Sequence, residues 1–182
     1  MCGRFVLKSL PERLHAQFGA DVSHLNWAPH FNIGPQQLVP IVRIVDGRRC
    51  ADLLRWGLIP SCAKGPTLGN RLINARSETV ATKPAFRAAF GSRRCIVTAE
   101  GFFEWQQQAT GKQPFFIHRR DAALLAMAGL REHWMAPVTR EVVEIFTNLT
   151  TEVVSRCAAC TTVAGAAAGT GNRSMGESGR GG

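Results

Sequence analysis

The N-terminal sequence Met1-Cys2-Gly3-Arg4-Phe5 contains a cysteine directly after the initiator methionine. Removal of Met1 would leave Cys2 as the first residue, with an α-amine and a thiol on adjacent carbons. Both groups are partly nucleophilic near neutral pH. The amine can condense with an aldehyde to an imine, and the thiol can then close a five-membered thiazolidine ring in a fast intramolecular step. The pattern predicts capture of an aldehyde; the alternative is a cysteine that falls at a frayed terminus by accident.

A second candidate is Glu104, which lies between aromatic residues in the segment Phe102-Phe103-Glu104-Trp105. Apolar surroundings favour the protonated form of a carboxylate, which suits a group that exchanges protons near neutrality. In a strand, Phe103 and Trp105 would share one face, and Phe102 and Glu104 the other. The alternative is an edge-strand glutamate whose carboxylate is in water.

Asn74 and Arg76 form a third candidate pair, because two residues of an extended segment point to the same face. The Arg76 guanidinium could hold a phosphate through two parallel hydrogen bonds, and the Asn74 amide could orient a reacting oxygen or imine. The alternative is a turn-forming asparagine beside a surface arginine.

Metal and cofactor sites are not predicted. Cys157 and Cys160 have the spacing of a metal or redox pair, but no second pair or neighbouring histidine completes a zinc site. The five histidines are scattered, and no glycine-rich loop that could cradle phosphates precedes a helix.

The net charge of +9 is concentrated in the middle of the chain, where residues 64–121 hold ten Lys and Arg against four Asp and Glu. A basic surplus attracts phosphates and nucleic acid, although a general preference for arginine would also produce it. No apolar run is long enough to span a membrane and no export signal is present. We therefore expect a cytoplasmic, monomeric protein with reduced cysteines and no membrane partner.

The elements that must position these residues are mostly strands. Asp46-Gly47 between two apolar runs is a strong hairpin signal, and Ser9-x-x-Glu12 followed by Leu14, Phe18 and Gly19 predicts one capped helix. A second short helix is expected over 84–90, and the segments 24–35 and 61–69 are expected to be loops. The expected strands are 38–45, 50–59, 95–97 running on into 100–105, 115–118, 124–130 and 142–147. This pattern predicts an α+β fold, mainly an antiparallel or mixed β-barrel-like sheet with short peripheral helices.

The composition changes after Glu152. Residues 164–182 contain seven Gly and four Ala, and no Leu, Ile, Phe or Trp follows Glu152. Such a segment buries too little apolar surface to offset the entropy of ordering it, so we expect one domain over 1–152 and a disordered tail over 153–182. We further hypothesise that the reading frame changed near Glu152, which would leave the C-terminal part incomplete, a sheet edge unpaired and apolar surface exposed.

Five motifs in this order resemble the SOS response-associated peptidase (SRAP) family, whose members process abasic sites in DNA. They are Met1-Cys2-Gly3-Arg4-Phe5, Asn32-Ile33-Gly34-Pro35, Trp56-Gly57-Leu58-Ile59-Pro60, Asn74-Ala75-Arg76-Ser77-Glu78-Thr79 and Glu100-Gly101-Phe102-Phe103-Glu104-Trp105. The segments 112–117 and 145–147 continue the resemblance, which covers about residues 1–152.

The resemblance implies a DNA-repair protein of the SOS response that senses abasic sites in single-stranded DNA and is nucleoid-associated when bound. It implies that Cys2, once Met1 is removed by autoprocessing, crosslinks the sugar aldehyde as a thiazolidine, with a lyase-like activity. Asn74 would bind the opened sugar and Glu104 would shuttle protons. Arg4 and Arg76 would hold flanking phosphates, and Trp105 belongs with them as a DNA-binding residue.

Two departures from the family pattern stand out. Aromatic residues often follow the Trp-Gly…Pro segment in the family, whereas Ser61-Cys62-Ala63 stands here. The family also carries a histidine after the strand equivalent to 142–151, and no histidine of this sequence lies beyond His133. We therefore expect slow crosslinking.

Two other functions fit the residues. One is an N-terminal-nucleophile cysteine amidase that uses the Cys2 thiol with its α-amine as base. The other is a non-catalytic single-strand-binding module in which Arg76, Arg93, Arg94 and Trp105 supply charge and stacking.

Overall fold

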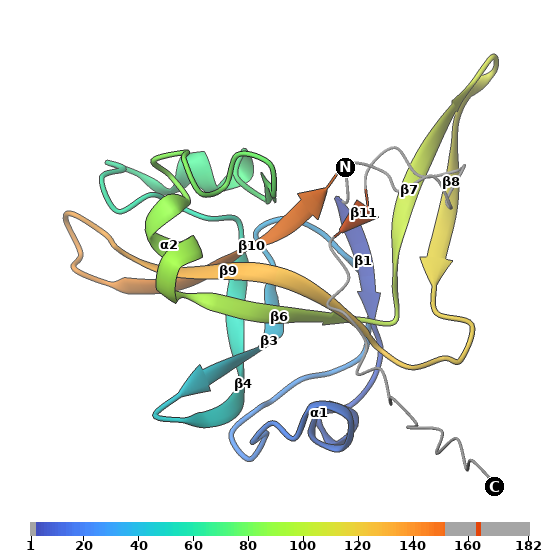
Figure 1. The fold of residues 1–182 in the computed structure, drawn as a ribbon, viewed down its shortest axis with the longest axis horizontal. Coiled ribbons are helices and arrows are strands. Elements are labelled where there is room, and N and C mark those ends of the chain that lie inside the picture. The colour runs from blue at the N-terminus through green and yellow to red at the C-terminus, as the bar shows by residue number, and fades with distance from the viewer. Residues whose placement is uncertain (1–2, 152–162, 165–182) are drawn as a thin grey trace, which may run out of the picture.

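Five strands close into a mixed barrel (Figure 1). The computed structural model describes residues 3–151 and 163–164. The barrel strands follow the order β10-β4-β3-β6-β9, and β9 pairs with β10 over seven residues to close the ring. Only the β10–β4 contact in the ring is parallel. The barrel strands are β3 (Leu38–Val45), β4 (Arg48–Trp56), β6 (Arg94–Ala99), β9 (Leu125–Met135) and β10 (Val142–Thr151).

A second sheet of four strands lies beside the barrel in the order β2-β1-β7-β8. All three of its strand pairs are antiparallel, and the β7–β8 hairpin projects from the body of the molecule (Figure 1). The strands of this small sheet are β1 (Arg4–Leu7), β2 (His30–Ile33), β7 (Gly101–Gln108) and β8 (Gly111–His118). The expected α+β barrel fold is therefore confirmed.

Short elements complete the structure. The helix α1 (Pro11–Phe18) ends at Gly19, whose φ of 62° is the left-handed conformation that glycine adopts without strain. The others are the 3₁₀ helix η1 (Pro66–Asn70), β5 (Asn74–Arg76), α2 (Arg87–Ser92) and β11 (Val163–Ala164). No helix in the described part of the chain has the length and apolarity needed to cross a lipid bilayer.

The predicted hairpin is confirmed in its register. Val45 pairs with Arg48, so Asp46 and Gly47 alone form the turn, and both have positive φ values of 49° and 78°. This turn matches the right-handed twist of the strands that it joins.

Two apolar clusters form on opposite faces of β10, because side chains alternate along a strand. Phe146 belongs to the larger cluster, inside the barrel and under the small sheet. Ile145 belongs to the smaller cluster, which is covered by α2 and the segment around η1. The even-numbered residues of β10, from Glu144 to Thr150, therefore share the inner face with Phe146.

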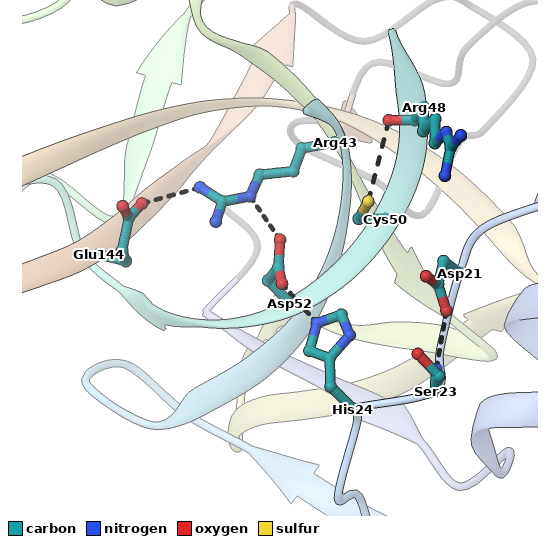
Figure 2. A network of polar contacts seen from close by, with 8 residues as sticks. All are labelled: Asp21, Ser23, His24, Arg43, Arg48, Cys50, Asp52 and Glu144. Atoms are coloured by element: carbon teal, nitrogen blue, oxygen red, sulfur yellow. Dashed lines mark hydrogen bonds and ion pairs between the residues drawn. The ribbon is translucent and has the colours of Figure 1, made fainter. Parts of the chain in front are cut away.

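A network of charges lies at the end of this inner face where β10 begins (Figure 2). Arg43 of β3 bonds Asp52 of β4 at 2.5 Å and Glu144 of β10 at 3.0 Å, and His24 bonds the other oxygen of Asp52 at 2.7 Å. Burial opposes ionisation of Asp52, but the hydrogen bonds from His24 and Arg43 outweigh it and lower the pKa of this carboxyl. The network joins three barrel strands and the loop before β2.

Several local expectations were wrong. The predicted capping box does not form: Leu10 is the N-cap residue, and the Ser9 hydroxyl donates to Glu100. The segments 24–35 and 61–69, expected to be loops, contain β2 and most of η1. The strand expected to run from Cys95 to Trp105 is broken at Glu100 into β6 and β7, which belong to different sheets.

The tail expected to be disordered, 153–182, lies outside the described residues except for β11. β11 pairs with β10 through Thr151↔Val163 and Thr150↔Ala164. The sheet edge that we expected to be unpaired is not found at β10 in the described residues, since this strand has β9 on one side and β4, β5 and β11 on the other.

Candidate active site

Glu104 is buried on the inner face of β7, with 3% of its surface exposed. Phe102 pairs with Phe5, and both side chains belong to the main core. Glu104 follows two residues later and shares their face. Its neighbour Phe103 pairs with Arg4, two residues after Cys2 in the sequence. Cys2 itself lies outside the described residues.

Three aromatic rings connect this part of the small sheet with the barrel. Trp56 lies 5.0 Å from Phe5 and 6.3 Å from Phe146, measured between ring centroids. The Trp56 indole also donates to the carbonyl oxygen of Ile73 at 2.8 Å, which fixes the residue before β5. The Trp56 ring thus packs between a ring of the small sheet and a ring of β10.

Asn74 and Arg76 lie on β5, which has the extended conformation expected from the sequence. β5 pairs with β10 in parallel, with Asn74 opposite Asn148 and Arg76 opposite Thr150. The Ser77 amide then donates to the Thr150 carbonyl at 2.8 Å. Asn74 is half-buried and Arg76 is exposed, so the pair spans the boundary between the barrel interior and solvent.

Asn148 is a polar residue of this face that the sequence analysis missed. Its side chain is fully buried, and within the described residues neither its amide nitrogen nor its oxygen has a hydrogen-bond partner. It shares the inner face of β10 with Phe146 and stands beside Asn74. The signal in the sequence was an asparagine two residues after Phe146 in an apolar strand, where a core side chain is expected. Burying an amide without a hydrogen-bond partner costs stability, and such a group is suited to bond a ligand.

Arg4 and Trp105 lie on the other face of the small sheet from Glu104. Trp105 is 38% exposed, and its ring centroid is 6.4 Å from that of Phe103. The Arg4 guanidinium lies against the backbone of Gly34, because a Cβ atom at that position would be 1.6 Å from Arg4 Nη1. The candidate residues therefore divide into a buried group, Glu104 with the half-buried Asn74, and an exposed group, Arg4, Arg76 and Trp105.

Other residues from the sequence analysis do not join this site. Arg93 bonds Glu132 at 2.6 Å, and the Arg94 guanidinium lies 5.2 Å from the centroid of the Phe90 ring. No group of His, Cys, Asp and Glu suited to a metal occurs in residues 3–151, and Cys157 and Cys160 lie outside the described residues. Burial raises the pKa of the Cys95 thiol to about 12, so it stays protonated and unreactive.

Comparison with known proteins identifies the family. The sequence model of the family described as SOS response associated peptidase (SRAP) matches residues 1–161. The chain belongs to this family. The match extends nine residues past the boundary of 152 that the composition suggested.

Curated relatives of this SRAP protein are similar over most of its length. The abasic site processing protein YobE of Bacillus subtilis (strain 168) is 41% identical over 138 residues, which cover 74% of this chain and 63% of YobE. The abasic site processing protein YedK of Escherichia coli (strain K12) is 33% identical, with 71% and 59% covered. The abasic site processing protein HMCES of Xenopus tropicalis is 30% identical, with 69% and 46% covered. The matched part thus spans less than two thirds of each relative.

Solved structures share the fold. A protein of Bacteroides thetaiotaomicron superposes with a TM-score of 0.81 at 24% identity, covering 91% of this chain and 76% of the other. A protein of Bordetella bronchiseptica superposes with a TM-score of 0.70 at 26% identity, covering 85% and 74%. The barrel with its attached small sheet is therefore an experimentally observed architecture.

Proposed function

We propose that this SRAP protein processes abasic sites in single-stranded DNA by crosslinking to them through Cys2. The main support is Glu104, a buried carboxylate on β7 whose neighbour Phe103 pairs with Arg4, two residues after Cys2. Membership of a family whose relatives are named abasic site processing proteins supports the same substrate. The folded unit that acts is the SRAP domain over about residues 1–152.

The reaction needs a free N-terminus. After Met1 is removed, the Cys2 amine attacks the aldehyde carbon of the ring-opened sugar and water leaves as the imine forms. The Cys2 thiol then adds to the imine carbon while its proton passes to the nitrogen, which closes the thiazolidine ring. The net change is the release of one water molecule, with no oxidation or reduction. Removal of Met1 by the protein itself would account for the peptidase name of the family.

Glu104 is the proton carrier in this proposal. It protonates the ring oxygen as the sugar opens and recovers that proton from the anomeric hydroxyl. It then protonates the hydroxyl that leaves as water and recovers that proton from the amine. A carboxylate with 3% exposure exchanges protons with the substrate in preference to solvent. Asn74 orients the opened sugar through its amide, from the strand next to Asn148.

The exposed residues hold the DNA strand. Arg4 and Arg76 bond phosphates on either side of the lesion, and Trp105 stacks on a base. The protein acts as a cytoplasmic monomer that joins the nucleoid when it is bound to DNA.

Two variants with opposite defects test the mechanism. Cys2→Ser removes the thiol, and an alanine inserted before Cys2 buries the amine in a peptide bond. We expect both to lose the adduct that survives denaturing electrophoresis with abasic single-stranded DNA, and to retain reversible DNA binding. Intact mass of the wild-type protein should show that Met1 is absent.

The same protein preparations distinguish crosslinking from the two other functions. A stable adduct formed by either variant would contradict the thiazolidine. Cleavage of an amide substrate without DNA would favour a cysteine amidase, and a complex that only salt disrupts would favour a non-catalytic binding module.

A further inference from the structure

A row of four rings runs along the outer face of the small sheet. Trp105 and Phe103 lie 6.4 Å apart, Phe103 and Phe116 5.1 Å, and Phe116 and His118 5.4 Å, between ring centroids. Their order follows from the hairpin register, in which Phe103 pairs with Phe116 and Gly101 with His118. The Phe116 ring lies directly on Gly101, because a Cβ atom there would be 2.6 Å from it.

The row borders two adjoining hollows that share Lys8, Glu100 and Phe116. The first, of about 250 Å³, is lined in addition by Val6, Phe31 and Phe103. Its lining is therefore largely apolar. The Phe31 side chain is 65% exposed, because nothing in the described residues covers it. The second, of about 450 Å³, adds Arg13, His118 and Arg119, with Ser9 and Ala122.

The charge around the hollows is mainly positive. In the described residues, neither Lys8 nor Arg13 has a carboxylate within ion-pair distance, whereas Arg119 is paired with Asp121. Glu100 is held by the main-chain amides of Lys8 and Ser9 and by the Ser9 hydroxyl. Its carboxylate therefore secures the chain between β1 and α1. Arg13 Nη2 donates to the carbonyl oxygen of Ala122 at 3.3 Å, but this neutral partner leaves its charge uncompensated. The charges of Lys8 and Arg13 can therefore meet a negatively charged ligand.

Flat apolar rings beside unpaired cations match single-stranded nucleic acid, which offers bases to stack and phosphates to neutralise. A second copy of this chain would bring Lys8 and Arg13 against the same positive charges, which disfavours self-association. An apolar protein partner would remove water from these cations without supplying counter-charges, which is unfavourable.

We propose that this outer face binds the undamaged strand that continues from the lesion, with bases on Phe31, Phe103 and Phe116 and phosphates on Lys8 and Arg13. The inference rests on the proposed function for its substrate, and it adds a second contact surface that starts at Trp105. It predicts that affinity for single-stranded DNA continues to rise when the strand is lengthened beyond the nucleotides that contact the lesion site.

The test compares an abasic strand of about 5 nucleotides with an undamaged strand of about 20 nucleotides, on the scale of known single-strand sites. We expect Phe31→Ala and Phe116→Ala each to lower the affinity for the long strand about tenfold, as measured by fluorescence anisotropy. Crosslinking of the short abasic strand should be unchanged. Lys8→Gln should lower the salt slope for the long strand by about 0.7. Ile44→Ala, on an exposed residue of the β3–β4 hairpin, is the matched control and should change nothing.

Phe31 is the decisive position, because a side chain so exposed can be removed without unfolding the protein. Unchanged affinity of Phe31→Ala and Lys8→Gln for the long strand would overturn the proposal. A dimer in light scattering that Phe31→Ala dissociates would assign the face to a second copy and would also overturn it. If no abasic strand forms an adduct while these variants still bind the long strand more weakly, the proposed crosslinking is wrong and the proposed binding face is supported.

Discussion

Glu104 combines near-complete burial with a position beside the strand that begins the chain. Replacing Glu104 with Gln keeps the shape of the side chain and removes its proton exchange. We expect the crosslinking rate to fall about 10²–10⁴-fold, as for other positioned acid–base groups, with little change in affinity for undamaged DNA. Single-turnover gels and anisotropy measure the two quantities. A loss of affinity at an unchanged rate per bound complex would make Glu104 a scaffold residue.

The Asn148 side chain is buried beside Asn74 and has no hydrogen-bond partner among the described residues. Asn148→Leu replaces the amide by an apolar group of similar size, so it should raise the free energy of unfolding by about 1–3 kcal/mol. If the amide bonds the substrate, the same change should slow crosslinking. Urea denaturation and single-turnover gels check both effects. Asn148→Leu would contradict this interpretation if stability fell and the rate did not change.

At the scale of elements, β1 and β2 cooperate to position Arg4. Pairing of Phe5 with Ile33 brings Gly34 under the Arg4 guanidinium, where a Cβ atom has no room. Gly34→Ala should therefore displace this side chain while changing the melting temperature little, because the far end of an arginine moves easily. We expect its single-strand affinity to fall as far as that of Arg4→Ala.

A double-mutant cycle provides the control for this prediction. If Gly34→Ala acts by moving Arg4, the two changes together should weaken binding no more than either alone. Additive losses would show that Gly34 affects binding by another route.

At the scale of the whole molecule, the network of Arg43, Asp52, Glu144 and His24 ties three barrel strands to the loop before β2 (Figure 2). The pKa of Asp52 is lowered in the folded state, so its ionised form stabilises the protein above the unfolded pKa of about 3.9. This stabilisation is lost as the pH falls through the folded pKa. Asp52→Asn should reduce the free energy of unfolding by about 1–3 kcal/mol near neutral pH and by much less in acid. Urea denaturation across this pH range measures the difference.

Asp121 is the matched control for Asp52. Its ion pair with Arg119 also lowers its pKa, but both side chains are well exposed and water and salt screen the pair. Asp121→Asn should therefore change stability less than Asp52→Asn at neutral pH. An equal loss for the two variants would show that the network around Asp52 has no special role.

Local sequence determined the elements whose signals act over a few residues. Asp46-Gly47 specified the hairpin because its two positive φ values suit this turn, and Gly19 ended α1 for the same reason. Alternation in the segment 102–105 correctly separated Phe102 and Glu104 from Phe103 and Trp105, since the period of a strand is two. The capping box failed because Ser9 found a partner in Glu100, 91 residues away.

Tertiary structure alone decided how these elements meet. The parallel contact of β10 with β4 in the barrel, and the pairing of Asn74 with Asn148, join residues far apart in sequence whose register no local pattern encodes. The break at Glu100 likewise sends β6 and β7 into different sheets. The types of the candidate residues were therefore visible in the sequence. Their division into a buried and an exposed group depends on long-range strand pairing, because a shift of one residue in register would turn each side chain to the opposite face.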